Sequence, residues 1–223
     1  MRSPLPFPFD EPRPEDLAAE LAARDCLEEC RIKAGLKRIP IPVPVEDWIE
    51  GELEIDYGFE ELTDCVGYAM PQDRVIRIAN MVAHDDCKVR WTAAHELGHV
   101  YIENPEETGI RLGDPLYSSL YDNASERQAE RFAAAFLMPI EDLVDSLFKI
   151  SSDHGLESFK TITSLMRRTS RTEDLWRRVF VPGMARHFNV AIPGVLFRLG
   201  ELRLIDGPPL LLPRYLLALS STM

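Results

Sequence analysis

Two histidines four residues apart, with a glutamate beside the first, are the residues of this chain best suited to chemistry. They form the segment His95-Glu96-Leu97-Gly98-His99, which has the pattern H-E-x-x-H. On a helix, residues four apart lie about 5–6 Å apart on one face, so both imidazoles can reach a zinc ion at roughly 2.0–2.1 Å. Zinc lowers the pKa of its water toward about 7, and the glutamate can accept the proton. The pattern therefore predicts zinc ligands at His95 and His99 and a general base at Glu96.

Two other interpretations of this pattern compete with a hydrolytic site. The histidines could be ordinary polar residues of a helix, or the site could bind a metal without cleaving anything. The chain has five histidines among 223 residues, and at that composition the pattern arises by chance in roughly 1 chain in 100. The spacing and the helical context favour the hydrolytic interpretation.

A catalytic zinc usually has three protein ligands and one open position, so a third ligand is needed. The next acidic helix, expected over 123–137, carries Glu126 and Glu130 four residues apart on one face. One of them could bind the metal while the other orients a ligand. Glu126 also fits a capping box with Asn123, in which it would satisfy amides at the start of its own helix. The spacing does not decide between these roles.

The elements that must position these residues can be read from periodicity, prolines and glycines. We expect a helix over 14–33 ended by Gly35, and a short helix over 46–50 ended by Gly51. Three strands are expected over 52–57, 65–70 and 74–79, the last two forming a hairpin. The zinc helix should begin at Asp85 or Asp86 and end near residue 103. The last third predicts further helices at about 140–149, 155–168, 173–180, 183–188 and 193–201.

Composition excludes several classes of protein. A net charge of −12 argues against broad binding to phosphate backbones. The four cysteines form no C-x-x-C pair and indicate a reducing compartment. The chain lacks the run of roughly 18 apolar residues that a membrane span needs, and its Pro-rich start lacks the apolar core of a secretory signal. We therefore expect a cytoplasmic protein that does not bind membranes.

The H-E-x-x-H segment and the glutamate-containing helix that follows it together resemble motifs of the ImmA/IrrE family of metallopeptidases. That family reads H-E-L-G-H and then, after a loop, E-x-x-A-N/E-x-F-A-A-x-L-L-M-P. This chain has HELGH at 95–99 and ERQAERFAAAFLMP at 126–139. Residues 40–80 have a similar layout, with a Pro-led short helix, a strand and a Gly-containing hairpin before the zinc helix. The resemblance covers about residues 40–140. The chain differs at Glu103, near which many members carry another histidine.

The resemblance implies an α+β fold, with a minimal zincin-like core of a small three-stranded sheet packed on helices and a mainly helical C-terminal region. It implies that Glu126 joins His95 and His99 in binding Zn²⁺. It also implies that Glu130 orients one of these ligands without binding the ion itself. Members of the family typically cleave a DNA-binding repressor. The implied activity is that of a zinc-dependent endopeptidase whose partner is a specific regulatory protein, a repressor.

The implied organisation has three parts: an N-terminal extension and helix over 1–39, a zincin-like domain over 40–150 and a helical region over 151–223. Within the last, 184–205 resembles a helix-turn-helix-like segment of the family. It could read DNA or pack against the catalytic domain. The acidic chain and the few base-reading groups favour packing, so we expect no direct binding of nucleic acid. The apolar tail 207–223 indicates packing or a partner contact.

Several alternatives stay open at this level. The chain could be a non-cleaving regulatory protein that binds a repressor or toxin partner through a zincin fold. Manganese or another divalent ion could replace zinc. An oxyanion stabiliser should face the substrate carbonyl. Residue type alone gives four candidates for that role: Tyr117, Tyr121, His154 and His187.

Overall fold

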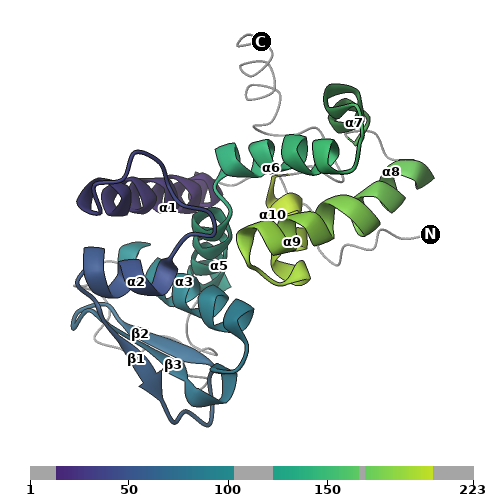
Figure 1. Ribbon diagram of the computed structural model, residues 1–223. Helices are drawn as coiled ribbons and strands as arrows, with labels where there is room; N and C mark the ends of the chain where they lie inside the picture. Colours follow the sequence, from purple (N-terminus) through teal and green to yellow (C-terminus); the bar gives the residue numbers. More distant parts are fainter. Residues whose placement is uncertain (1–13, 103–122, 166–168, 203–223) are drawn as a thin grey trace. The chain divides into compact units, whose positions relative to one another are not determined.

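The computed structural model describes residues 14–102, 123–165 and 169–202 (Figure 1). The described residues form two compact units, one reaching up to Leu137 and the other beginning at Met138. The first unit holds a three-stranded mixed sheet with helices, and the second is helical. The predicted α+β class, with a small sheet packed on helices and a helical C-terminal region, is confirmed.

The first unit contains every strand of the described residues. Its elements, in chain order, are α1 Pro14–Lys33, α2 Val45–Asp47, the π-helical turn η1 Trp48–Glu52, β1 Asp56–Glu60, β2 Gly67–Met70, β3 Val75–Ala79, the 3₁₀ turn η2 Asn80–Val82, α3 Asp86–Ile102 and α5 Asn123–Leu137.

The sheet has the strand order β1-β3-β2. β2 and β3 form the predicted hairpin and run antiparallel, with Ala69 opposite Ile76. β1 runs parallel to β3 on its other side, with Tyr57 opposite Ile76. β2 is therefore an edge strand, and among the described residues it pairs on one side only.

The helices stack on this sheet in layers. β2 and β3 pack on α3, α3 packs on α5, and α5 in turn contacts α1 (Figure 1). Two buried phenylalanines of α5 tie these layers together. Phe132 stacks on Phe136 at 5.7 Å between ring centroids, and the Tyr101 ring of α3 lies 5.9 Å from Phe132. Trp48 meets Phe136 edge-on at 6.3 Å, which attaches η1 to the same core.

The helix boundaries follow local hydrogen bonds. Gly35 ends α1 at φ +66°, and Leu36 N–H donates to the Arg31 carbonyl, as expected of a glycine stop. Asp85 begins α3, because its carboxylate accepts a hydrogen bond from Lys88 N–H at 3.1 Å. Both predicted boundaries are confirmed.

The predicted stop at Gly51 and the predicted start of the first strand at residue 52 are wrong. Leu53 N–H donates to the Trp48 carbonyl, so the turn widens and continues past Gly51. Glu54 then adopts a left-handed φ of +53°, and Ile55 N–H returns to the Ile49 carbonyl. Because this turn uses the backbone through residue 55, β1 begins only at Asp56.

Arg90 joins the start of α3 to the segment before α2. Its guanidinium is buried, donates to the Val43 carbonyl at 2.9 Å and lies 3.7 Å from the Glu46 carboxylate. Arg90→Met keeps the apolar stem but leaves the Val43 carbonyl without this donor. We expect the free energy of unfolding to fall by about 1–2 kcal/mol in urea denaturation. Arg24→Met, at an exposed arginine of α1, should change it by less than about 0.5 kcal/mol. Equal effects of the two changes would contradict the anchoring role.

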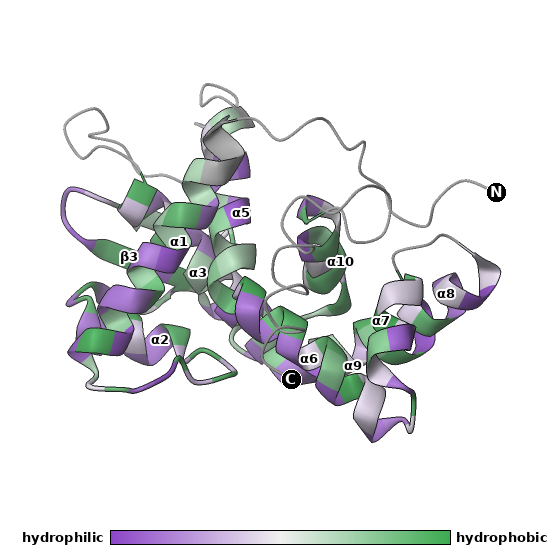
Figure 2. Ribbon diagram, turned by 90° about the horizontal axis from the view of Figure 1, so that it is seen from above, coloured by the Kyte–Doolittle hydropathy of each residue, from purple (hydrophilic) through white to green (hydrophobic). Residues whose placement is uncertain are grey.

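The second unit is built from helices only. They are α6 Ile140–Asp153, α7 Ser158–Leu165, α8 Ser170–Leu175, the π-helical turn η3 Trp176–Phe180, α9 Val181–Phe188 and α10 Ile192–Glu201. In Figure 2, α6 and α9 each carry hydrophobic and hydrophilic residues along their length, which is typical of helices that pack by one face.

The connections between the later helices of this unit differ in part from the prediction. The predicted break between helices 173–180 and 183–188 is wrong, because α8, η3 and α9 follow one another without an intervening loop. Asn189 ends α9, in a left-handed conformation at φ 52°. In α10, Arg198 is 2% exposed and its Nε donates to the Met138 carbonyl at 3.1 Å. That arginine of the helix-turn-helix-like segment is thus used in packing.

Among the described helices, none combines the length and the apolar character that a membrane crossing requires.

Candidate metal centre

Three side chains from two helices bring their ligand atoms together. His95 and His99 lie one turn apart on α3, and Glu126 lies in the first turn of α5. One ligand atom from each of the three falls within 4.8 Å of the others, and within the described residues this is the one group of three or more histidine, cysteine or acidic side chains that meets this condition. The structure thus brings together the two predicted histidines and the predicted third ligand.

The spacing of these atoms fits a small divalent ion. The two Nε2 atoms of His95 and His99 are 3.2 Å apart, and the Glu126 carboxylate lies 3.2 Å from the first and 3.5 Å from the second. Tetrahedral ligands at roughly 2.0–2.1 Å from zinc stand about 3.3 Å from one another. Two imidazole nitrogens and one carboxylate oxygen are also a common donor set of a catalytic zinc, which leaves a fourth position open.

The exposure of the three side chains differs. His99 is 1% exposed, whereas 20% of the His95 side chain and 41% of the Glu126 side chain are accessible. The cluster is closed behind His99 and open toward His95 and Glu126. Water or a substrate can therefore approach from the open side.

Negative charge is concentrated around the His95 ring. Burial of the ring lowers the pKa of His95, but its hydrogen bond to Glu126 acts in the opposite direction and raises it. The nearby charges of Glu96 and Glu130 add to the rise, so that the pKa of His95 is raised overall. The same hydrogen bond lowers the pKa of Glu126 against the effect of its burial. An environment that favours a proton here also favours a bound cation.

Glu96 is held against the edge strand of the sheet. Glu96 is buried, with only 3% of the residue exposed. A Cβ added at Gly67 of β2 would lie 2.6 Å from the Thr92 methyl carbon and 3.1 Å from Oε1 of Glu96. A glycine at this position therefore lets the backbone of β2 approach the carboxylate closely, as expected where a strand carries an isolated glycine.

Gly98 allows the two helices of the site to approach. A Cβ at this position would lie 3.0 Å from Cα and 3.2 Å from the carbonyl oxygen of Ala129, and 3.2 Å from Cβ of Phe132. These atoms belong to α5, one and two turns after Glu126. The absence of a side chain at Gly98 thus permits the helix spacing at which Glu126 reaches the two histidines.

The remaining predicted site residues fall into three groups. Glu130 contributes to the electrostatic environment of His95, in keeping with a supporting position. Tyr117 and Tyr121 lie outside the described residues. His154 and His187 belong to the second unit, where they line one pocket together. A role in stabilising an oxyanion stays a prediction for all four candidates.

Sequence reasoning did not assign a role to Gly67 or Gly98. A signal for both was present. An isolated glycine inside a helix, such as Gly98, costs about 1 kcal/mol relative to alanine and usually has a packing reason, and one inside a strand, such as Gly67, indicates a close approach of another group. The partners of each glycine are distant in the chain, so the contacts themselves required the structure.

Comparison with known families agrees with this geometry. Residues 66–173 match the model of the peptidase M78 family, whose description is IrrE N-terminal-like domain. The match begins at β2 and ends in α8, so that it includes α3, α5 and the whole histidine and glutamate cluster. It confirms the resemblance to ImmA/IrrE proteins and supports a metallopeptidase type of function. No curated protein matches the chain significantly.

Proposed function

Because residues 66–173 carry the IrrE N-terminal-like domain of the peptidase M78 family, we propose that this protein is a zinc-dependent endopeptidase that cleaves a specific regulatory protein, a DNA-binding repressor. One observation carries the proposal: one ligand atom each of His95, His99 and Glu126 lies within 4.8 Å of the other two. Glu96 follows His95 directly on the same helix, and its charge acts on the His95 ring.

The residues have distinct tasks in peptide hydrolysis. His95, His99 and Glu126 hold the ion. When bound, zinc supplies a Lewis acid that polarises the scissile carbonyl and makes hydroxide available near neutral pH. Glu96 accepts the proton of the attacking water at its carboxylate and later delivers a proton to the leaving amine. The exposed side at His95 and Glu126 admits the peptide.

Zinc is favoured over other ions by the donor set. Magnesium and calcium prefer oxygen ligands, whereas two imidazoles and one carboxylate suit zinc. The separation of 3.2 Å between the two Nε2 atoms is close to the roughly 3.3 Å between neighbouring ligands of a tetrahedral zinc ion.

The edge strand supports an extended peptide as substrate. β2 pairs with β3 on one side and, within the residues that the structure describes, with no strand on the other. Its Gly67 lies against Glu96. A substrate segment that pairs with the outer side of β2 by main-chain hydrogen bonds would pass beside that carboxylate.

The charge of the chain supports a basic partner. The net charge is −12, and opposite charges speed encounter and disfavour wrong partners. DNA-binding repressors need clustered Lys and Arg to bind phosphate backbones. An acidic peptidase therefore suits a substrate of this class.

Elemental analysis of the purified protein tests the metal site. We expect about one zinc ion per chain, none in His95→Ala, and weakened retention in Glu126→Ala, because that variant keeps both imidazole ligands whereas His95→Ala keeps only one. His84→Ala is the matched control, since His84 is an exposed histidine just before α3. No zinc in the wild type, even after addition, would contradict the proposal, as would equal loss in the His84 variant.

A further inference from the structure

A pocket in the second unit is lined mainly by cationic and hydrogen-bonding side chains. It has a volume of about 290 Å³ and lies where α6 meets α9. Its lining residues are Ser146, Lys149, Ile150, Asp153, His154, Gly183, Arg186 and His187. The volume is close to the lower end of the roughly 300–1,000 Å³ typical of small-molecule pockets.

The pocket is built by close packing of the two helices. A Cβ at Gly183 of α9 would lie 2.9 Å from Cδ1 of Ile150 on α6. Ile150, Gly183 and Ser146 are buried and form the inner wall, whereas Lys149 and Arg186 are exposed at the rim. The hydroxyl of Ser146 already donates to the Leu143 carbonyl at 2.7 Å. Donors for a ligand therefore come from the lysine, the arginine and the two histidines.

The two cations of this pocket have no ion-pair partner within the part of the chain that the structure describes. Among the described residues, neither Lys149 nor Arg186 forms an ion pair, even though Asp153 lies one turn after Lys149 on α6. Burial, and then the positive charge of Lys149, lowers the pKa of His187. In the lining the two cations, Lys149 and Arg186, outnumber the one carboxylate, Asp153, although the chain as a whole carries −12.

A metal ion does not suit this arrangement. His154, His187 and Asp153 are ligand types, but they do not bring their ligand atoms together as the α3–α5 cluster does. Two permanent cations at the rim would also repel a divalent ion. An oxyanion, in contrast, can accept hydrogen bonds from an ammonium, a guanidinium and two imidazole N–H groups, and hydrogen bonds to charged groups are the stronger kind.

We propose that the pocket formed by Lys149, His154, Arg186 and His187 binds the phosphate group of a small anionic molecule, as free phosphate or as a phosphomonoester. A phosphate dianion presents several acceptor oxygens and matches more of these donors than a monocarboxylate does. The site is built from residues of the second unit and shares none with the proposed peptidase site.

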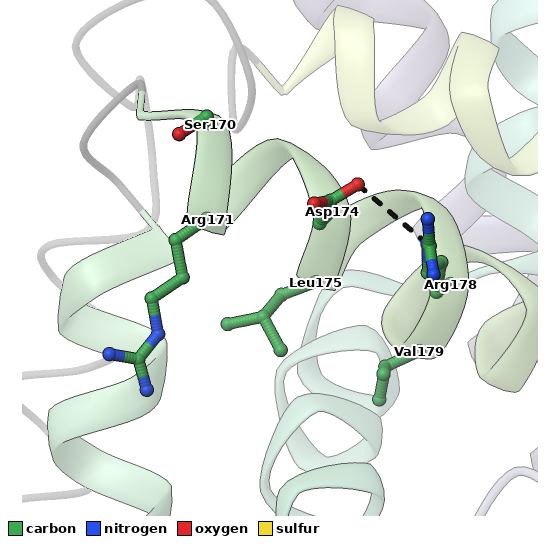
Figure 3. Close-up of a pocket in the computed structure, with 6 residues that line it drawn as sticks. All are labelled: Ser170, Arg171, Asp174, Leu175, Arg178 and Val179. Carbon is green, nitrogen blue, oxygen red and sulfur yellow. Dashed lines mark ion pairs between the residues drawn. The ribbon is translucent and has the colours of Figure 1, made fainter.

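A second hollow in the same unit supplies a matched comparison. It lies on α8 and η3 and is lined by Ser170, Arg171, Asp174, Leu175, Arg178 and Val179 (Figure 3). Its one carboxylate, Asp174, lies 3.7 Å from Arg178 and 2.6 Å from Arg177, so the acidic group of this hollow already has cationic partners. Arg171→Gln removes a cation from the same unit without touching the pocket of α6 and α9.

Calorimetric titration of the full-length, metal-loaded protein tests the proposal. The probes are inorganic phosphate, glycerol phosphate and acetate, at constant ionic strength in chloride. We expect saturable binding of at least one phosphate probe, with affinity about tenfold or more weaker in Lys149→Gln and in Arg186→Gln. Acetate should bind detectably more weakly, and Arg171→Gln should leave the affinity unchanged. The tighter of the two phosphate probes identifies free phosphate or an ester as the ligand.

Three results would overturn the assignment. One is that neither phosphate probe binds. Another is that acetate binds as tightly as phosphate, which would indicate a general salt effect. The third is an equal affinity in the wild type and in both pocket variants, which would place the phosphate elsewhere, for instance on the metal. Circular dichroism of the exposed Lys149 and Arg186 variants verifies that they are folded.

Discussion

Glu96→Gln is expected to lower peptide cleavage by about 10²–10⁴-fold while the metal stays bound. The amide has nearly the shape of the carboxylate but cannot accept the proton of the attacking water. The three proposed metal ligands, His95, His99 and Glu126, are untouched. Glu96 is buried beside β2, so an uncharged side chain is tolerated there and the fold should persist.

The measurement is cleavage of purified candidate repressors, chosen among those encoded near the gene, followed by mass spectrometry of the products. Zinc content is determined on the same preparations. Glu50→Gln is the control, because Glu50 is an exposed glutamate of the same unit, and it should cleave as the wild type does. Glu96→Asp should retain a small part of the activity, since its carboxylate is a methylene shorter.

The outcome also separates the peptidase from its alternative. A non-cleaving regulator that binds a repressor or toxin through a zincin fold needs no general base. If Glu96→Gln keeps full regulatory activity and the wild type leaves every candidate partner intact, the binding protein becomes the better interpretation. If Glu96→Gln loses both zinc and activity, Glu96 has a structural role and the assignment as base is wrong.

The parts of this protein that sequence reasoning predicted are those set by local spacing. The pairing of His95 with His99 follows from the 3.6-residue turn of one helix, and Asp85 and Gly35 mark helix ends through contacts within a few residues. The hairpin of β2 and β3 is likewise local. These features needed no knowledge of distant contacts.

Other features depended on tertiary contacts. The position of Glu126 in the sequence fits a capping box and a metal ligand equally well. The ligand role is favoured by the structure, because the Glu126 carboxylate lies 3.2 Å from Nε2 of His95. The start of β1 depended on the left-handed Glu54 and the widened turn before it. The pocket shared by His154 and His187 joins residues 33 positions apart, one directly after α6 and the other on α9. Residue type alone had placed both histidines among candidates for the catalytic site.

Gly98 links the local motif to these tertiary contacts, because it lies inside H-E-x-x-H yet contacts α5. Gly98→Ala places a methyl group 3.0 Å from the backbone of Ala129, where no side chain can rotate away. Forcing extra atoms into a packed core costs about 1–3 kcal/mol, which the better helix propensity of alanine offsets by about 1 kcal/mol. We expect a net loss of up to about 2 kcal/mol of unfolding free energy, or a Tm lower by up to about 8 °C.

The same substitution should weaken the metal site, because the displaced helix carries Glu126 one turn before Ala129. Ligands must hold their positions within about 0.5 Å, so a shift of α5 should lower zinc affinity by about tenfold or more in competition with a chromogenic chelator. Gly51→Ala is the matched control: a Cβ there meets no atom within 4 Å, and its stability and zinc affinity should stay close to those of the wild type. If Gly98→Ala and Gly51→Ala behave alike in both measurements, the approach of α3 to α5 does not set the geometry of the site. If Gly98→Ala loses zinc affinity beyond what its loss of stability can explain, the glycine positions the third ligand.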